Sequence, residues 1–177
     1  MEAIDRIKAV GMHASFFDKA KVAIDNGYYF EAIMYEYAAI EGRLEIICGL
    51  LGCPCNKDVA TDIRRKIAIG NRIECLKRIY KNHPACKNGK IQINNSFWKS
   101  LKNWTMERNK YVHGLYKNPV EYTQRLSERE RIAVTGLDFA NMLYNETKRL
   151  RRIRKTHPEI VEYSENRCKS KRCILNI

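Results

Sequence analysis

The sequence predicts an all-α fold, namely an up-and-down bundle of four to five long helices followed by a basic C-terminal tail. Apolar residues recur at steps of three and four along most of the chain, whereas the alternation typical of strands is nearly absent. Helix-ending and helix-starting signals divide this pattern into long segments with short links. With 177 residues, the chain is long enough for one domain with a sizeable core. We expect the bundle over residues 1–155 and the tail over 156–177.

The first two helices are expected over about 3–24 and 28–51. Asn26-Gly27 should end the first helix, because glycine readily adopts the left-handed conformation that terminates many helices. The second helix has a nearly unbroken apolar face, which predicts its burial. This face comprises Phe30, Ile33, Tyr37, Ile40, Leu44, Ile47 and Leu51.

Turn and capping signals place the next two helices. A third helix begins near Asp58, and Pro84 lies in a loop that we expect over 82–94. A fourth helix starts near Asn95 and ends around Gly114.

The last helix is long and becomes strongly basic toward its end. Asn118-Pro119 is a helix-entry signal, and Ser127 with Glu130 forms a capping box. The formal charge of +13 favours a polyanionic partner, with nucleic acid as the first expectation. The alternative is a solvated helix end that suits the helix dipole. The cations expected to bind nucleic acid are Arg149, Arg151, Arg152, Arg154 and Lys155.

We expect neither an export signal nor a membrane-spanning segment in this sequence. Its first residues, Met1–Arg6, lack the apolar core of a signal peptide, and no apolar run approaches the roughly 20 residues of a membrane span. We therefore expect a soluble, cytoplasmic protein with no membrane partner, in which the seven cysteines are mostly reduced. Cys48 and Cys75 follow helical apolar patterns and should be buried. A four-thiolate zinc site, whose spacing matches no known zinc motif, is the alternative for Cys53, Cys55, Cys168 and Cys173.

Arg108 interrupts the apolar face of the fourth helix. Its neighbours at helical spacing are Phe97, Leu101, Trp104, Tyr111 and Leu115. Arginine keeps its charge in proteins, and burying that charge without a partner costs several kcal/mol. Arg108 therefore either pairs with a carboxylate in the core or holds an anion in a cleft.

A polar face lies beside this apolar face on the same helix. It includes Lys102, Asn109, His113 and Tyr116. Asn109 and His113 are four residues apart, so the amide is able to orient the imidazole. Arg108 and His113 point about 140° apart on a straight helix. They meet at one phosphate only if Arg108 swings round, if the helix is distorted near Gly114, or if a second chain supplies one of them.

These residue types suit cleavage of RNA by attack of a 2′-hydroxyl on the adjacent phosphate. Histidine changes its protonation near neutral pH and serves as a general base or acid. Arginine offers a fixed positive fork to the phosphate in the transition state. Neither role needs a metal, and the sequence has no convincing carboxylate cluster for magnesium, so we expect neither a metal nor a cofactor.

The stretch Arg108-Asn109-Lys110-Tyr111-Val112-His113 resembles the Arg-(x)4–6-His motif of HEPN-domain proteins, in which a polar residue, often Asn, follows the arginine. These proteins are all-helical bundles, and many are metal-independent endoribonucleases in toxin–antitoxin, abortive-infection and CRISPR systems. The resemblance implies that Arg108 contacts the scissile phosphate, that His113 is the general base or acid, and that Asn109 orients the site. It also implies a homodimer with a composite cleft.

Glu41 and Glu45 lie at the edge of the apolar face of the second helix. HEPN proteins often pair an acidic residue of this helix with the motif, so we expect both to support the site, together with Lys102 and Tyr116. The structural alternative is a salt bridge to Arg108 that only locks two helices together.

The function that we expect is a metal-independent endoribonuclease in a toxin or antiviral defence system, with RNA as substrate and an antitoxin or defence-complex protein as partner. One alternative is a non-catalytic HEPN-like subunit that binds nucleic acid or serves as a scaffold. A second alternative is a basic helical adaptor in which the motif is coincidental.

Overall fold

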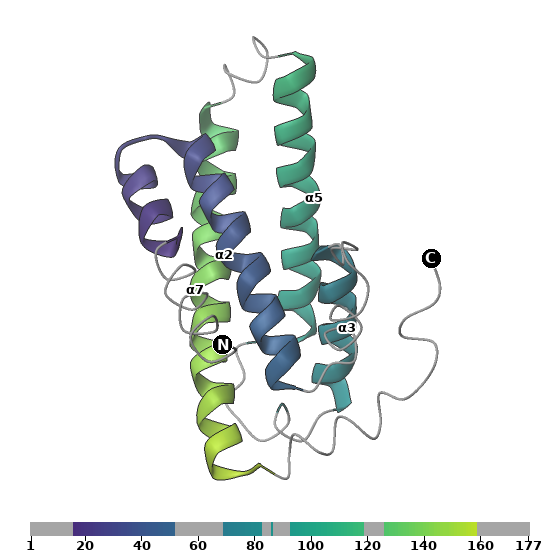
Figure 1. Ribbon diagram of the computed structural model, residues 1–177. Helices are drawn as coiled ribbons and strands as arrows, with labels where there is room; N and C mark the ends of the chain where they lie inside the picture. Colours follow the sequence, from purple (N-terminus) through teal and green to yellow (C-terminus); the bar gives the residue numbers. More distant parts are fainter. Residues whose placement is uncertain (1–15, 52–68, 83–85, 87–92, 119–125, 159–177) are drawn as a thin grey trace, which may run out of the picture. The chain divides into compact units, whose positions relative to one another are not determined.

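The computed structural model describes residues 16–51, 69–82, 86, 93–118 and 126–158, and the statements below refer to these ranges (Figure 1). Within them the protein is helical and contains no strand, so the predicted all-α bundle is confirmed. A helix at 16–25 precedes the four labelled helices, α2 (Tyr29–Leu50), α3 (Ile69–Asn82), α5 (Asn95–Lys117) and α7 (Leu126–Thr156). None of the described helices combines the length and apolar character needed to cross a membrane.

The chain divides into two compact units. Unit 1 comprises Met1–Arg43 and Leu101–Leu143, and unit 2 comprises Leu44–Ser100 and Tyr144–Ile177. Helices α2, α5 and α7 each contribute a segment to both units, whereas α3 belongs to unit 2 alone.

The helix at 16–25 ends where the sequence predicts. Gly27 has a φ of 75°, and its N–H donates to the Ile24 carbonyl at 2.9 Å. The Tyr28 N–H reaches back to the Ala23 carbonyl at 2.8 Å. This pair of bonds is the Schellman arrangement, in which a left-handed glycine satisfies the last helical carbonyls.

Helix α5, which carries the Arg108 motif, starts as predicted but ends later. The Asn94 side chain caps it by accepting a hydrogen bond from the Phe97 N–H at 3.0 Å. The helix then continues past Gly114 to Lys117, and the Asn118 N–H donates to the Gly114 carbonyl at 2.8 Å. Gly114 therefore lies within the helix, because a glycine ends a helix only when the backbone turns left-handed there.

Two further boundaries differ from the prediction. Helix α7 already includes Leu126, so Ser127 lies inside the helix instead of capping it. Cys86, expected in a loop, is helical and buried, since its small apolar side chain fills core space. The expected start of the third helix near Asp58 and the entry signal at Asn118-Pro119 involve positions outside the described residues.

Residues that the sequence predicts to be buried are buried in each unit. Cys48 and Cys75 are buried thiols, as expected. In unit 1, the Trp104 indole N–H donates to the Ile132 carbonyl at 2.9 Å and so joins α5 to α7. On the predicted face of the second helix, Ile33, Ile40, Leu44, Ile47 and Leu51 are buried, whereas Phe30 and Tyr37 are partly buried. The four cysteines of the alternative zinc site lie outside the described residues.

Candidate functional site

The apolar face around Arg108 is present as the sequence predicts. Phe97, Leu101, Trp104 and Tyr111 are buried, and Leu115 is partly buried. Arg108 itself is half-buried in unit 1, where its charged end lies against α2.

Three side chains hold the Arg108 guanidinium. Its carbon lies 4.1 Å from the centre of the Tyr37 ring, in a cation–π contact. Nη1 donates to Asn109 Oδ1 and Nη2 donates to the Met34 sulfur, both at 3.0 Å. The buried Nε has no hydrogen-bond partner among the described residues. The arginine is thus held by an aromatic face, an amide oxygen and a thioether.

This environment leaves the charge of Arg108 only partly compensated. Burial lowers the pKa of Arg108, while Tyr37 and Glu41 act in the opposite direction. A thioether sulfur is a weak hydrogen-bond acceptor. An anionic phosphate oxygen would be a much stronger acceptor for the same guanidinium, because charge-assisted hydrogen bonds are about twice as strong as neutral ones. The arrangement therefore suits an anion at Nη2, where the contact to Met34 is exposed.

Asn109 and His113 do not form the predicted pair. The Asn109 side-chain oxygen accepts from Arg108, and no hydrogen bond joins Asn109 to His113 within the described part of the chain. His113 is exposed on α5, about 140° around the helix from Arg108. Asn109 therefore positions the arginine, and Arg108 and His113 project in different directions from one helix.

The two glutamates of α2 that the sequence predicts to support the site belong to different units. Glu41 is partly buried in unit 1 and acts on Arg108 through its charge. Glu45 lies in unit 2 with a side chain 56% exposed, and its Oε2 is 3.7 Å from Nη1 of Arg72. The ion pair described for Glu45 thus involves Arg72, and Glu41 is the one of these two glutamates whose charge acts on Arg108.

The other two residues of α5 that the sequence predicts to support the site are Lys102 and Tyr116. Lys102 is exposed, and its backbone carbonyl accepts a hydrogen bond from the Thr105 hydroxyl at 2.7 Å. Tyr116 lies within α5, and its side chain is outside the described part of the structure.

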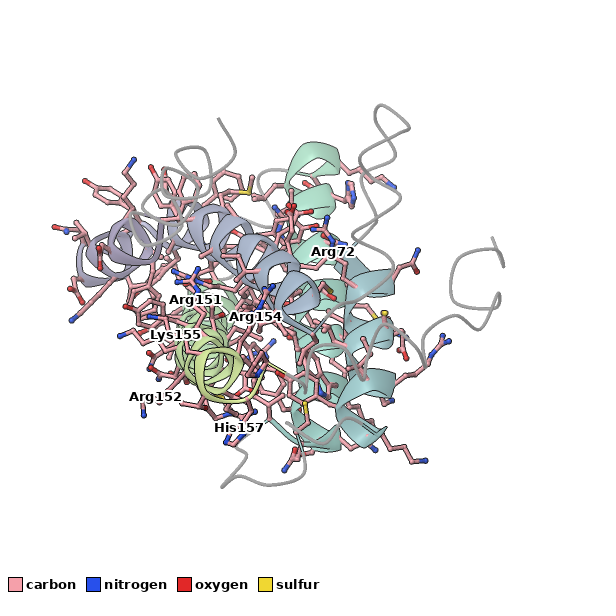
Figure 2. All side chains as sticks on the ribbon, turned by 60° about the horizontal axis from the view of Figure 1, so that its bottom comes forward. Arg72, Arg151, Arg152, Arg154, Lys155 and His157 are labelled. Atoms are coloured by element: carbon pink, nitrogen blue, oxygen red, sulfur yellow. The ribbon has the colours of Figure 1, made fainter. Side chains whose placement is uncertain are left out.

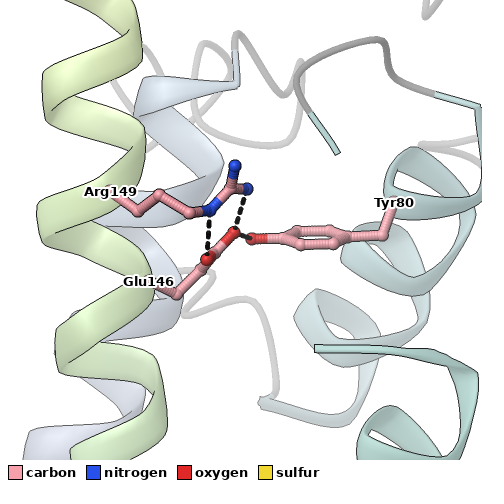
Figure 3. Close-up of polar contacts among 3 residues, drawn as sticks. All are labelled: Tyr80, Glu146 and Arg149. Atoms are coloured by element: carbon pink, nitrogen blue, oxygen red, sulfur yellow. Dashed lines mark hydrogen bonds and ion pairs between the residues drawn. The ribbon is translucent and has the colours of Figure 1, made fainter. Parts of the chain in front are cut away.

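Arg149, which the sequence assigned to nucleic-acid binding, is part of a buried cluster in unit 2 (Figure 3). Its Nε and Nη2 each donate to a different oxygen of Glu146 at 2.7 Å. The Tyr80 hydroxyl donates to the same carboxylate at 2.7 Å. Burial and the neighbouring Glu146 charge raise the pKa of Tyr80 well above its usual value, so the phenol keeps its proton. Arg149 is therefore already neutralised within the fold.

The other cations of this run lie at the end of α7. Arg152, Arg154 and Lys155 are exposed and Arg151 is partly exposed. Figure 2, which views this end of the helix, shows their side chains spreading around it. They are accessible to a polyanion.

Sequence reasoning missed Glu36, a fully buried carboxyl group in unit 1. Neither of its oxygens has a hydrogen-bond partner among the described residues, and the group lies against Trp104 and Gly136. Burial, assisted by the charge of Asp138, raises the pKa of Glu36 to about 9. A signal was present in the sequence, because Glu36 stands three residues after Ile33, inside the apolar face of α2.

Met34 and Tyr37 were also missed as partners of Arg108. They are three residues apart and so lie on one side of α2. Their types are common on any helix, and only the packing of α2 against α5 in unit 1 distinguishes them.

Comparison with known proteins returned no matching family model, no matching curated protein and no matching solved structure.

Proposed function

We propose that this protein is a metal-independent endoribonuclease of the HEPN type that acts in a toxin or antiviral defence system. In this proposal Arg108 binds the scissile phosphate, and His113 moves the proton between the 2′-hydroxyl and the leaving oxygen. Asn109 holds the arginine in place. The products are a 2′,3′-cyclic phosphate and a 5′-hydroxyl.

One observation carries the proposal, namely the setting of Arg108. Its guanidinium contacts an aromatic ring, an amide oxygen and a thioether sulfur, and these groups orient a cation without neutralising it. A purely structural arginine in a core is expected to resemble Arg149, whose Nε and Nη2 donate to the two oxygens of one carboxylate. The resemblance of residues 108–113 to the family motif supports the same role.

Cleavage of a labelled RNA in EDTA tests this role. We expect cyclic-phosphate products from the wild type and a loss of at least about 100-fold for Arg108→Ala and for His113→Ala. Lys110→Gln is the matched control, since it removes an exposed cation of the same helix and should retain activity. Full activity of both alanine variants would exclude this site.

The wide angle between Arg108 and His113 supports a composite site in a homodimer. In such a dimer, one chain supplies the arginine and the other chain supplies the histidine of each site. Mixing Arg108→Ala with His113→Ala chains would then create mixed dimers with one intact site. We expect this mixture to regain about one quarter of wild-type activity, because half of the dimers are mixed and each has one working site of two. A mixture that stays inactive would contradict the composite site.

The same angle also favours the second candidate, a non-catalytic HEPN-like subunit that binds nucleic acid or serves as a scaffold. For that function we expect RNA binding without cleavage by the wild type.

A further inference from the structure

The end of α7 carries an unusual density of positive charge. Between Thr147 and Pro158 the sequence has six lysines and arginines and no aspartate or glutamate. The structure separates these cations into groups with different roles. Arg149 is bound to Glu146, whereas the other five are at least partly exposed.

Four of the exposed cations lie on one side of the helix. Lys148, Arg151, Arg152 and Lys155 follow the spacing i, i+3, i+4, i+7, which places them within about 100° of arc. We call these four residues the basic stripe. Arg154 falls outside this arc, because it lies about 60° beyond Arg151 around the helix.

The basic stripe is kept in place by the fold of unit 2. Lys148 Nζ lies 4.2 Å above the centre of the Tyr144 ring, one turn earlier on the same side of α7. The opposite side of this segment, with Glu146, Thr147 and Leu150, is buried. The four cations are therefore presented on a helix whose rotation is fixed by its own core.

The basic stripe is electrostatically unfavourable in isolation. Lys148 with Arg152 and Arg151 with Lys155 are like charges at i, i+4, a spacing that destabilises a helix. The helix dipole offsets part of this repulsion. A polyanion lying along the helix would relieve the rest and release its own counterions.

We propose that the basic stripe is a docking surface for the phosphodiester backbone of nucleic acid, separate from the Arg108 site. The stripe extends about 10 Å along α7, which matches a few consecutive phosphates. Lysines and arginines spaced along one side of an exposed helix suit contacts to phosphate oxygens, which position a protein on nucleic acid without reading its sequence. A membrane surface is the poorer fit, because the apolar side of this helix segment is packed in the protein and is not available for insertion.

Binding of a 2′-O-methyl RNA of about 20 nucleotides tests the proposal. This probe has no 2′-hydroxyl and cannot be cut, so the result does not depend on the proposed nuclease activity. The test variant replaces all four stripe residues by glutamine. The control replaces four exposed cations elsewhere, Lys21, Arg78, Lys81 and Lys99, and so removes the same charge.

We expect the stripe variant to bind about 10-fold or more weakly at 0.1 M salt and to lose about 3 units from the slope of log K against log salt. The control should lose much less of both. A variant that exchanges lysine and arginine within the stripe keeps all four charges and should bind like the wild type, which shows that binding depends on charge and not on side-chain identity. Equal losses in the stripe and control variants would overturn the proposal. So would equally tight, stripe-dependent binding of polyglutamate or of phosphatidylserine vesicles.

Discussion

Each of the two units contains a buried glutamate and an arginine, but these groups are hydrogen-bonded to each other in only one of the two pairs considered, Glu146 with Arg149 in unit 2. In unit 2, Glu146 accepts two hydrogen bonds from Arg149 and one from Tyr80. In unit 1, Glu36 has no hydrogen-bond partner among the described residues, and Arg108 rests on Tyr37 with no carboxylate in hydrogen-bond contact there.

The difference indicates what each cluster does for the protein. A buried carboxylate with a bidentate arginine and a phenol is satisfied, and removing any partner is costly. A buried carboxyl group without a hydrogen-bond partner and an arginine whose charge is only partly compensated stabilise a fold less than fully paired groups do. Such groups are typical of functional sites. We therefore infer that the Glu146 cluster stabilises the fold and that the Glu36 and Arg108 groups contribute less to stability.

The largest effect is expected at the satisfied cluster. Arg149→Met should lower the free energy of unfolding by about 3 kcal/mol, since it leaves the Glu146 carboxylate buried without its cation. Chemical denaturation at neutral pH measures this loss. Arg152→Met, three residues later on the surface of α7, is the control and should change stability by less than about 0.5 kcal/mol. Similar small changes for both variants would contradict a stabilising role for the cluster.

Glu36 should make the stability of the protein depend on pH. Its pKa is 4.5 in the unfolded chain and about 9 in the folded protein. Between these values the folded state holds a proton that the unfolded state has released, so the free energy of unfolding falls as the pH rises through this window. At pH 7 the cost is on the order of 3 kcal/mol.

The Glu36→Gln variant isolates this contribution. Its unfolding free energy should exceed that of the wild type by an amount that grows from pH 5 to pH 8, when both are measured by chemical denaturation. A constant difference across this range would show that Glu36 is ionised in the folded protein.

Two glycines allow the same comparison at the level of packing. A Cβ at Gly136 in unit 1 would meet the Glu36 carboxyl group and would lie 2.6 Å from Trp104 Cζ2, whereas a Cβ at Gly70 in unit 2 has nothing within 4 Å. Gly136→Ala should therefore cost about 1 to 3 kcal/mol. Gly70→Ala should gain about 0.5 kcal/mol through helix propensity. Thermal unfolding of both variants measures the contrast, and equal shifts would show that Glu36 and Trp104 do not pack closely on Gly136.

The smallest effect is expected at the phenol of the Glu146 cluster. Tyr80→Phe removes one of three hydrogen bonds to the carboxylate and should lower the free energy of unfolding by about 1 kcal/mol. Chemical denaturation resolves a change of this size. A loss as large as that of Arg149→Met would mean that the phenol, and not the arginine, is the main partner of Glu146.

The fold was largely predictable because helical periodicity and capping are local properties of the sequence. The apolar faces, the Gly27 stop and the start of α5 follow from residues within one or two turns of each other. The continuation of α5 through Gly114 was not predictable, because glycine is compatible with both a helix end and a helix interior.

The candidate site was predictable only in part. The position of Arg108 on an apolar face is a local pattern, and so is its spacing from His113. Its contacts to Met34 and Tyr37 are 74 and 71 residues away in sequence and depend on how α2 packs on α5 within unit 1. The sequence around α7 also does not show that Arg149 is bound within the fold while the neighbouring cations are exposed. This difference depends on a distant residue, because Tyr80 from α3 helps to hold the Glu146 carboxylate that binds Arg149.

The most direct test of this account is Arg108→Met, measured for both stability and RNA cleavage beside Arg149→Met. We predict that Arg108→Met changes the free energy of unfolding by no more than about 1 kcal/mol, because only a cation–π contact and neutral acceptors are lost. RNA cleavage should fall by at least about 100-fold. A loss of stability of about 3 kcal/mol with cleavage unchanged would contradict the account, because Arg108 would then be a structural residue like Arg149.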